Sequence, residues 1–162
     1  MTQNLKDQFI QQSITKMANE SKLHLFRNAK ETLHVSNYLS KIKCRETRSL
    51  FSKLRLGVLP LEVEKGRRSK VDRNQRLCKI CCNNQVEDET HFLFECAALA
   101  NQRLPFYNNL LLTSPQVANF TNNQKLMHLY FNENISTSAL DISGRLLVDL
   151  YKSRNNLLLE RD

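Results

Sequence analysis

Four of the five cysteines in this chain of 162 residues fall between residues 76 and 99, beside one of its four histidines. Cys78 and Cys81 are followed by His91 and Cys96, which gives the spacing C-x2-C-x9-H-x4-C. Two residues between two thiolates form a tight turn that aims both sulfurs at one ion, and a later His and Cys complete a tetrahedral set. We therefore predict a Cys3His zinc site of the zinc-knuckle kind, with these four residues as ligands.

Alternative roles for these cysteines fit the sequence less well. Ordinary buried or free cysteines rarely cluster beside a correctly spaced histidine. A redox C-x2-C pair would be expected within a βαβ pattern, and a disulfide framework would require a secretory signal. Cys82 remains an alternative to Cys81 as the second ligand, although C-x2-C is commoner than C-x3-C in zinc sites. Cys44 lies far from the cluster and is predicted to be a small buried residue.

The spacing between His91 and Cys96 constrains the local structure. On an ideal α-helix the two residues would point about 140° apart, so they can share one ion only if the helix begins or loosens there. The acidic sequence "EDET" before His91 suits a helix N-terminus, and we place His91 in a first turn. Glu95 is a candidate to orient the imidazole, against the simpler expectation of an exposed glutamate.

Composition favours a mostly α-helical protein. Apolar residues make up 41% of the chain, which is enough for a core, and there are only three glycines and three prolines. We expect a small helical domain organised around the central Cys3His site. An N-terminal helical segment is expected over residues 1–43, a basic helix-loop and zinc-binding module over 44–104, and a C-terminal helical segment over 105–162.

Regular spacing of apolar residues predicts the individual helices. The expected apolar stripes include Leu50, Phe51 and Leu54 in one helix, and Leu140, Leu147, Leu150, Tyr151, Leu157 and Leu158 on roughly one side of the last helix. Gly57 is expected to cap one of them, and Pro105 to interrupt another before a new helix starts. Residues 58–76 are expected to be extended and loop-like, with a turn at Gly66; Lys22–Phe26 alternates, which leaves a strand as an alternative there. The predicted helices cover residues 4–18, 22–43 (as one or two short helices), 45–57, 91–104, 105–112, 122–133 and 138–159.

The positive charge of the chain is concentrated in one quarter of it. Residues 41–80 hold thirteen Lys or Arg against four Asp or Glu, a balance of +9, whereas the other residues hold eleven against twelve. Such a concentration indicates an anionic partner more strongly than a uniformly basic composition does. The candidate phosphate contacts are Arg45, Arg48, Arg55, Arg67, Arg68, Lys70, Arg73, Arg76 and Lys79.

Several motifs in this region resemble a known family. They are the "LRLG" of Leu54–Gly57, the "LPLEVEKGR" of Leu59–Arg67, the "R-x-C-x-x-C" that begins at Arg76, and the "EDE-x-HFLF-x-C" of Glu87–Cys96. In combination they resemble the zinc-binding region that follows the polymerase domain in LINE-type (non-LTR) retrotransposon reverse transcriptases. The resemblance covers about residues 40–104, and it implies a nucleic-acid-associated role.

The resemblance does not imply catalysis, because the Tyr-x-Asp-Asp motif of the family's polymerase is absent from this sequence. A full four-ligand zinc site also leaves no open position for a reaction. We therefore expect a non-catalytic, zinc-stabilised nucleic-acid-binding module that looks like the tail of such an element. RNA is favoured over DNA, since the resemblance implies an element that handles its own transcript.

Two alternatives remain. The chain could be a scaffold whose helices after Cys96 bind a polymerase domain or another protein, or a degenerate fragment without a present function. The polar N-terminal residues lack the apolar segment of a signal peptide, and no apolar run is long enough to span a bilayer. We expect an intracellular protein, in the cytoplasm, the nucleus or both, without a membrane partner.

Overall fold

The computed structural model describes residues 3–19, 23, 25–26 and 35–161. These residues are mostly helical and form no strand, as predicted; Leu77 and Val86 make an isolated antiparallel bridge. No helix among them is long and apolar enough to cross a membrane. The elements, with short 3-10 and π turns written η, are α1 (Gln3–Asn19), α3 (Tyr38–Lys41), α4 (Arg45–Arg55), α5 (Glu62–Arg68), η2 (Arg73–Gln75), η3 (His91–Glu95), η4 (Ala97–Leu99), α6 (Ala100–Thr113), η5 (Pro115–Asn119), α7 (Asn122–Leu126), η6 (Met127–Phe131) and α8 (Thr137–Leu159).

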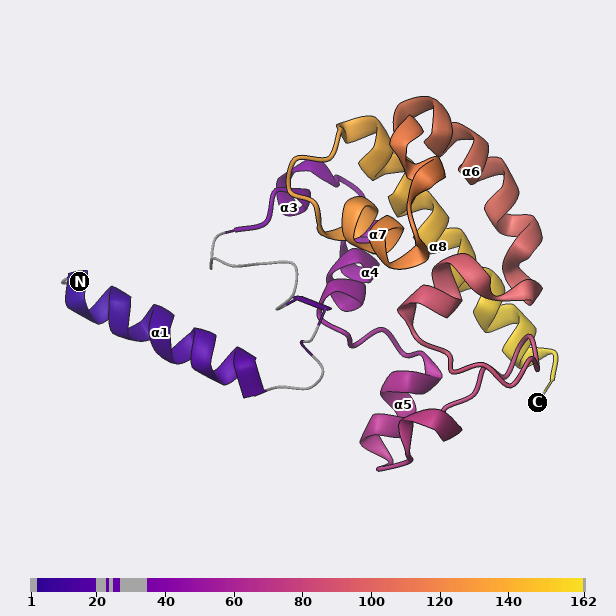
Figure 1. Cartoon of the computed structure of the whole chain (residues 1–162), viewed down its shortest axis with the longest axis horizontal. Coiled ribbons are helices and arrows are strands. Elements are labelled where there is room, and N and C mark those ends of the chain that lie inside the picture. The colour runs from indigo at the N-terminus through magenta and orange to yellow at the C-terminus, as the bar shows by residue number, and fades with distance from the viewer. Residues whose placement is uncertain (1–2, 20–22, 24, 27–34, 162) are drawn as a thin grey trace.

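The long C-terminal helix α8 forms the centre of the fold. It buries Leu140, Leu147 and Leu150, which the sequence predicted for one side of this helix. Helix α6 lies along α8 over the most extensive contact between described elements, and α4 packs against α8 as well (Figure 1). A Cβ atom at Gly144 of α8 would lie 2.6 Å from Thr47 Cγ2 of α4, so this glycine permits the close approach of the two helices.

The predicted helix over residues 45–57 is confirmed as α4. It buries the expected apolar stripe of Leu50, Phe51 and Leu54. Gly57 has φ 62°, and the Val58 N–H bonds the Lys53 carbonyl at 2.9 Å, which is the Schellman arrangement expected after a helix. The chain therefore leaves α4 in a fixed direction toward α5.

Helix α5 contradicts the prediction of an extended segment over residues 58–76. Its sequence "EVEKGRR" lacks an apolar stripe, but Glu62 and Glu64 face cations three or four residues later, a spacing that supports a helix. Gly66 lies inside this helix instead of forming the expected turn. A Cβ there would lie 2.5 Å from Arg76 Cγ, so the glycine makes room for the Arg76 side chain.

Two helix boundaries after the cysteines also differ from prediction. Residues 91–104 are not one helix, because the π turn η3 ends at Cys96, which has an extended ψ of 116°. Helix α6 then runs through Pro105 without interruption. Asn101 and Pro105 are both exposed, so water can bond the Asn101 carbonyl, which loses its helical donor at the proline.

The remaining predicted helices are present in part. The amphipathic helix over residues 4–18 appears as α1, and its Leu5, Phe9, Ile10 and Ile14 side chains are exposed. Residues 122–133 form α7 followed by the π turn η6. The segment Lys22–Phe26, for which a strand was the alternative, lies partly outside the described residues, as do residues 27–34 of the helical segment predicted over 22–43.

Candidate metal centre

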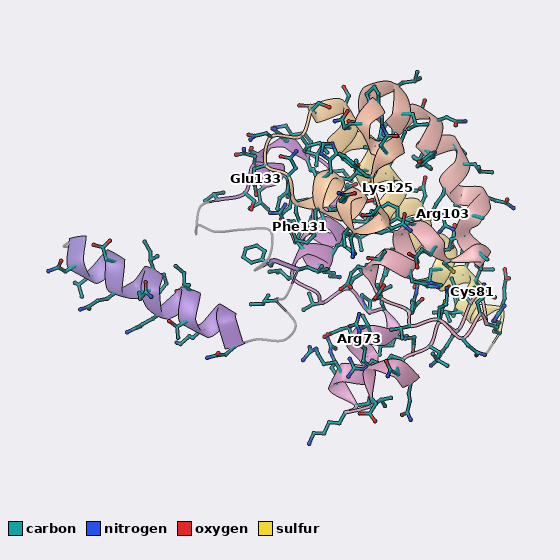
Figure 2. All side chains as sticks on the ribbon, in the orientation of Figure 1. Arg73, Cys81, Arg103, Lys125, Phe131 and Glu133 are labelled. Carbon is teal, nitrogen blue, oxygen red and sulfur yellow. The ribbon has the colours of Figure 1, made fainter. Side chains whose placement is uncertain are left out.

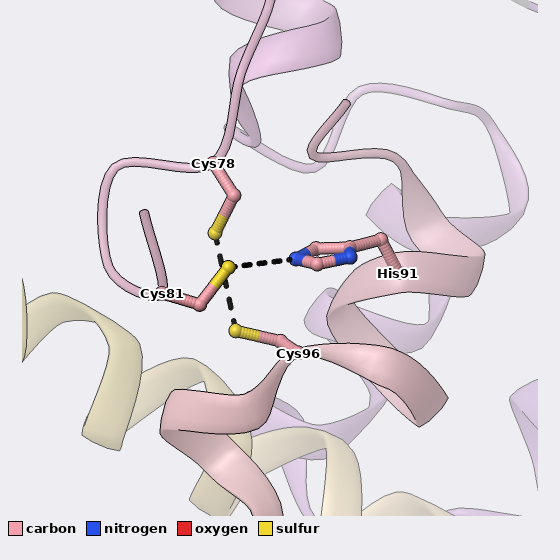
Figure 3. Close-up of side chains that lie close together, drawn as sticks. All are labelled: Cys78, Cys81, His91 and Cys96. Atoms are coloured by element: carbon pink, nitrogen blue, oxygen red, sulfur yellow. Dashed lines mark hydrogen bonds between the residues drawn. The ribbon is translucent and has the colours of Figure 1, made fainter. Parts of the chain in front are cut away.

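The four predicted ligands lie together in the structure. Their ligand atoms are all within 4.8 Å of one another. Cys78 Sγ lies 3.9 Å from Cys96 Sγ, and Cys81 Sγ lies 3.5 Å from His91 Nε2, so the four side chains point into one small volume (Figure 3). Cys78, His91 and Cys96 are buried, and Cys81 is partly buried. The group could hold a metal ion with four protein ligands.

A short hairpin-like turn positions the first two ligands. The Cys78 N–H bonds the Gln85 carbonyl at 2.8 Å, and the Glu87 N–H bonds the Arg76 carbonyl at 3.0 Å, on either side of the bridge between Leu77 and Val86. Between these bonds the chain turns tightly, and Asn84 has a positive φ of 54°. The closed turn brings Cys78 and Cys81 to the same side.

Cys82 lies outside the ligand group. It has a positive φ of 56° and is exposed, and its sulfur lies 2.9 Å from Arg161 Nη1. The structure thus brings Cys81 to the site as the second member of the pair. Cys44 is also exposed, which contradicts the prediction of a buried residue; hydrogen bonds from the Thr47 side chain and backbone hold the pKa of its thiol below the ordinary value.

The last two ligands are positioned by a π turn. The Cys96 N–H bonds the His91 carbonyl at 2.8 Å, which is an i→i+5 bond and brings the two residues one above the other. The prediction that the helix loosens between them is therefore confirmed. The Asp88 carboxylate accepts the His91 N–H at 3.0 Å, which confirms that the acidic segment supports the start of this turn.

The imidazole of His91 presents Nε2 to the thiols and leaves Nδ1 inside the protein. Nδ1 is buried without a hydrogen-bond partner among the described residues. Glu95 does not orient the ring, because it is exposed and accepts a hydrogen bond from Asn122 Nδ2 at 3.0 Å. The direction of the ring is thus set by the π turn and by burial.

The sulfurs of Cys78 and Cys96 lie within hydrogen-bond distance of each other. The hydrogen bond to Cys96 and burial raise the pKa of Cys78 to about 12, while the same hydrogen bond lowers the pKa of Cys96. A metal ion would have to displace the thiol protons, so its affinity falls as pH falls.

A buried ion pair beside the ligands was not predicted from the sequence. Arg154 of α8 donates from Nε and Nη2 to the carboxylate of Glu87 at 2.7 and 2.6 Å, and Glu87 Oε1 lies 3.9 Å from Cys78 Sγ. Glu87 also accepts the Glu62 N–H at 2.8 Å, at the start of α5. One carboxylate therefore connects the ligand turn to both α5 and α8.

A sequence signal for Arg154 was present. Arg154 follows Leu150 by four residues and precedes Leu157 by three, so it falls on the apolar side predicted for this helix. A cation inside an apolar stripe requires a buried anionic partner. The identity of that partner could not be read from local spacing, because Glu87 is 67 residues away.

One of the candidate phosphate contacts, Arg55, is buried inside the protein. Its side chain is 3% exposed, and it donates to the Tyr130 carbonyl at 2.7 Å and to Glu133 at 2.9 Å. Its guanidinium also lies over the rings of Tyr38 and Phe131, at 4.8 and 5.1 Å. The prediction that Arg55 contacts nucleic acid is wrong, since this residue holds α4, α3 and η6 together.

The other eight candidate cations lie nearer the surface but differ in their partners. Arg67 and Arg68 both bond the buried Glu64, and Lys79 pairs with Glu62. The side chains of Arg45 and Lys70 are exposed and make no hydrogen bond or ion pair with the described residues. The remaining three have partners as well: Arg48 bonds the Ile42 carbonyl, Arg73 pairs with Asp88, and Arg76 bonds the Val63 and Val71 carbonyls.

No protein-family model, curated protein or solved structure matches this chain. The resemblance to the zinc-binding region of LINE-type reverse transcriptases therefore rests on the sequence motifs and remains a prediction.

Proposed function

We propose that the protein is a zinc-stabilised nucleic-acid-binding module that is not itself catalytic. Zinc would hold the ligand turn and the π turn together, and the cations of the neighbouring α5 region would meet phosphates. The resemblance to a retrotransposon reverse transcriptase supports RNA over DNA. It also supports a polymerase domain as a second partner.

Two of the distances between ligand atoms match those of tetrahedral zinc, and they support zinc as the metal. With bonds of about 2.3 Å to sulfur and about 2.0–2.1 Å to nitrogen, tetrahedral zinc places its sulfurs about 3.8 Å apart and a sulfur and a nitrogen about 3.6 Å apart. The distance between Cys78 and Cys96 is 3.9 Å, and that between Cys81 and His91 is 3.5 Å. Three thiolates and an imidazole use all four positions, as in a structural zinc site.

The arrangement of cations around the two buried glutamates of α5 is the observation that best supports nucleic-acid binding. Glu62 and Glu64 are buried, yet they face four cations that reach the surface. Two carboxylates cannot neutralise four cations, so a net positive charge remains. The ion pairs also hold the cationic heads in place, which lowers the ordering entropy lost on binding a phosphate backbone. These four cations are Lys65, Arg67, Arg68 and Lys79.

The salt dependence of RNA binding tests this proposal. Replacement of both Arg67 and Arg68 would leave Glu64 buried without a partner, whereas Arg68→Ala leaves the two bonds from Arg67 to Glu64 intact. We expect Arg68→Ala combined with Lys70→Ala to flatten the slope of log affinity against log salt by about one to two units. The loss should be similar for all RNA sequences.

A charge-matched control is Lys16→Ala combined with Lys152→Ala, because both lysines are exposed and lie outside residues 41–80. This control should keep the wild-type slope, and both double variants should keep the wild-type zinc content. If the wild-type protein binds neither RNA nor DNA at low salt, or if the Arg68 and Lys70 variant keeps its slope, the proposed function is wrong.

A protein-interaction module is the second candidate function. Leu104 and Leu112 of α6 are 63% and 82% exposed, and four apolar side chains of α1 are exposed as well. Exposed apolar surface of this kind favours a protein partner. If the wild-type protein shows no salt-sensitive RNA binding in the test above, this function becomes the leading one.

A further inference from the structure

A cavity between α6 and α7 lies outside the metal centre and outside the basic segment. Its volume is about 260 Å³, and most of its wall is apolar, with Phe94, Leu104 and Tyr107 among the residues that line it. A recess of about 20 Å³ adjoins it and shares Phe94 and Tyr107. Drug-sized sites span about 300–1,000 Å³, so this cavity suits a single ring system.

Two cations also line the cavity and the recess: Arg103 and Lys125, which Figure 2 labels. Arg103 donates from Nη2 to the Cys96 carbonyl, but its Nη1 is buried and lacks a hydrogen-bond partner among the described residues. Lys125 Nζ lies 5.3 Å from the centre of the Tyr107 ring. Neither cation makes an ion pair with a described carboxylate.

These features restrict the chemistry of a ligand. The buried N–H of Arg103 needs an acceptor, since an unsatisfied buried donor costs about 1–3 kcal/mol. An aliphatic side chain would fill the apolar walls but would leave that donor unsatisfied, and a bare phosphate would leave the walls without a partner. A nucleobase offers both a flat face for Tyr107 and acceptors on its edge.

We propose that this cavity binds one unstacked base of a single-stranded RNA, with the ring on Tyr107, an edge acceptor on Arg103 Nη1 and the adjoining phosphate on Lys125. Aromatic stacking and a nearby cation are the usual elements of single-strand binding. The inference rests on the proposed function and adds a preference for single strands, which contacts to phosphates alone would not give.

Photocrosslinking of the zinc-loaded full chain tests the site without a variant. The probe is an oligouridine RNA that contains 5-iodouridine, and the crosslinked residue is identified by mass spectrometry. We expect the crosslink at Tyr107 or Phe94. A crosslink confined to residues outside the cavity would overturn the proposal.

A variant supplies the second measurement. Tyr107→Leu keeps an apolar wall but removes the stacking surface, and we expect an about tenfold loss of affinity for oligouridine with unchanged affinity for an RNA duplex. Lys152→Gln is the control, because Lys152 is exposed and does not line the cavity. Zinc content and the thermal transition must match those of the wild type.

The failures can be distinguished. If the wild type binds no RNA, the proposed function fails and this inference fails with it. If RNA binds but Tyr107→Leu loses nothing, or loses affinity for duplex and single strand equally, only the base site fails. Binding of a peptide of alternating Glu and Phe in the cavity, with oligouridine excluded, would assign the site to a protein partner and overturn the inference.

Discussion

Arg55 and Arg154 are both almost fully buried, but their surroundings differ. Arg55 lies over two aromatic rings and pairs with Glu133, which is 21% exposed. Arg154 makes two hydrogen bonds to Glu87, which is 1% exposed and lies beside the Cys78 sulfur. Arg55 thus belongs to an aromatic core, and Arg154 lies beside the candidate metal centre.

The difference indicates which part of the fold a bound metal would stabilise. Water can reach Glu133 if Arg55 is removed, and the surrounding rings still pack. Glu87 has no such access, and with zinc bound the three thiolates and the imidazole beside it would carry a net charge of −1. The positive charge of Arg154 therefore compensates the Glu87 carboxylate, because an isolated buried carboxylate next to thiolates is strongly destabilised.

The largest effect is expected from loss of a ligand. Structural zinc contributes on the order of 10 kcal/mol to small sites, which is comparable to the whole stability of a domain at about 5–15 kcal/mol. We expect Cys96→Ser to lose zinc and to unfold at least residues 76–99, with less effect on hydrogen exchange around Arg55. Metal analysis measures the zinc content, and hydrogen exchange measures the unfolding of each region. Retention of one zinc and of the thermal transition in Cys78→Ser would show that the ligand set is wrong.

The second largest effect is expected from Arg154→Met. Breaking a buried ion pair on one side costs about 3–5 kcal/mol, and loss of support around a ligand lowers metal affinity about 10- to 100-fold. Urea unfolding and competition with a chelator measure the two effects. Addition of Glu87→Gln should recover part of the stability, because the unpaired charge is removed. Unchanged zinc affinity in Arg154→Met would show that the ion pair between Arg154 and Glu87 does not support the metal ligands.

Arg55→Met sharpens the comparison with a smaller effect. We expect a loss of about 1–3 kcal/mol, because Glu133 can be hydrated and methionine keeps most of the apolar contacts. Zinc affinity should equal that of the wild type in the same chelator assay. A fall in zinc affinity as large as that of Arg154→Met would mean that the two arginines stabilise one cooperative unit.

The smallest effect is expected at Cys82. Its sulfur is outside the ligand group, so Cys82→Ser should keep the zinc content and change the free energy of unfolding by no more than about 0.5 kcal/mol. Cys81→Ser, the matched variant at the neighbouring residue, should lose the metal. Equal loss in both variants would make Cys82 a ligand.

The separation of partners along the chain decides which contacts the sequence can predict. All four ligands lie between residues 78 and 96, so their spacing carried enough information to predict the group and the loosened turn. Arg55 and Glu133 are 78 residues apart, and no local pattern sets the register between them. A cation next to an apolar stripe was therefore predicted to face solvent, although the fold buries it.

Two of the helical errors, at α5 and at Pro105, have local causes. Helix α5 lacks the apolar periodicity on which the prediction relied, and its support comes from pairs such as Glu64 with Arg67 and Arg68. Those pairs are visible in the sequence at spacings of three and four, and greater weight on them would have predicted the helix. The error at Pro105 is of the opposite kind: a break was predicted where the helix continues, because the packing of α6 on α8 outweighs one lost hydrogen bond.

The π turn between His91 and Cys96 would let the candidate metal centre tolerate the loss of one residue between these two ligands. An i→i+5 bond aligns the two ligands at the present spacing, H-x4-C. Deletion of one residue between them would give H-x3-C, which an ordinary α-helical i→i+4 bond would align on one face. Relatives that have lost one residue here could therefore keep all four ligands, and a search for them should accept both H-x4-C and H-x3-C.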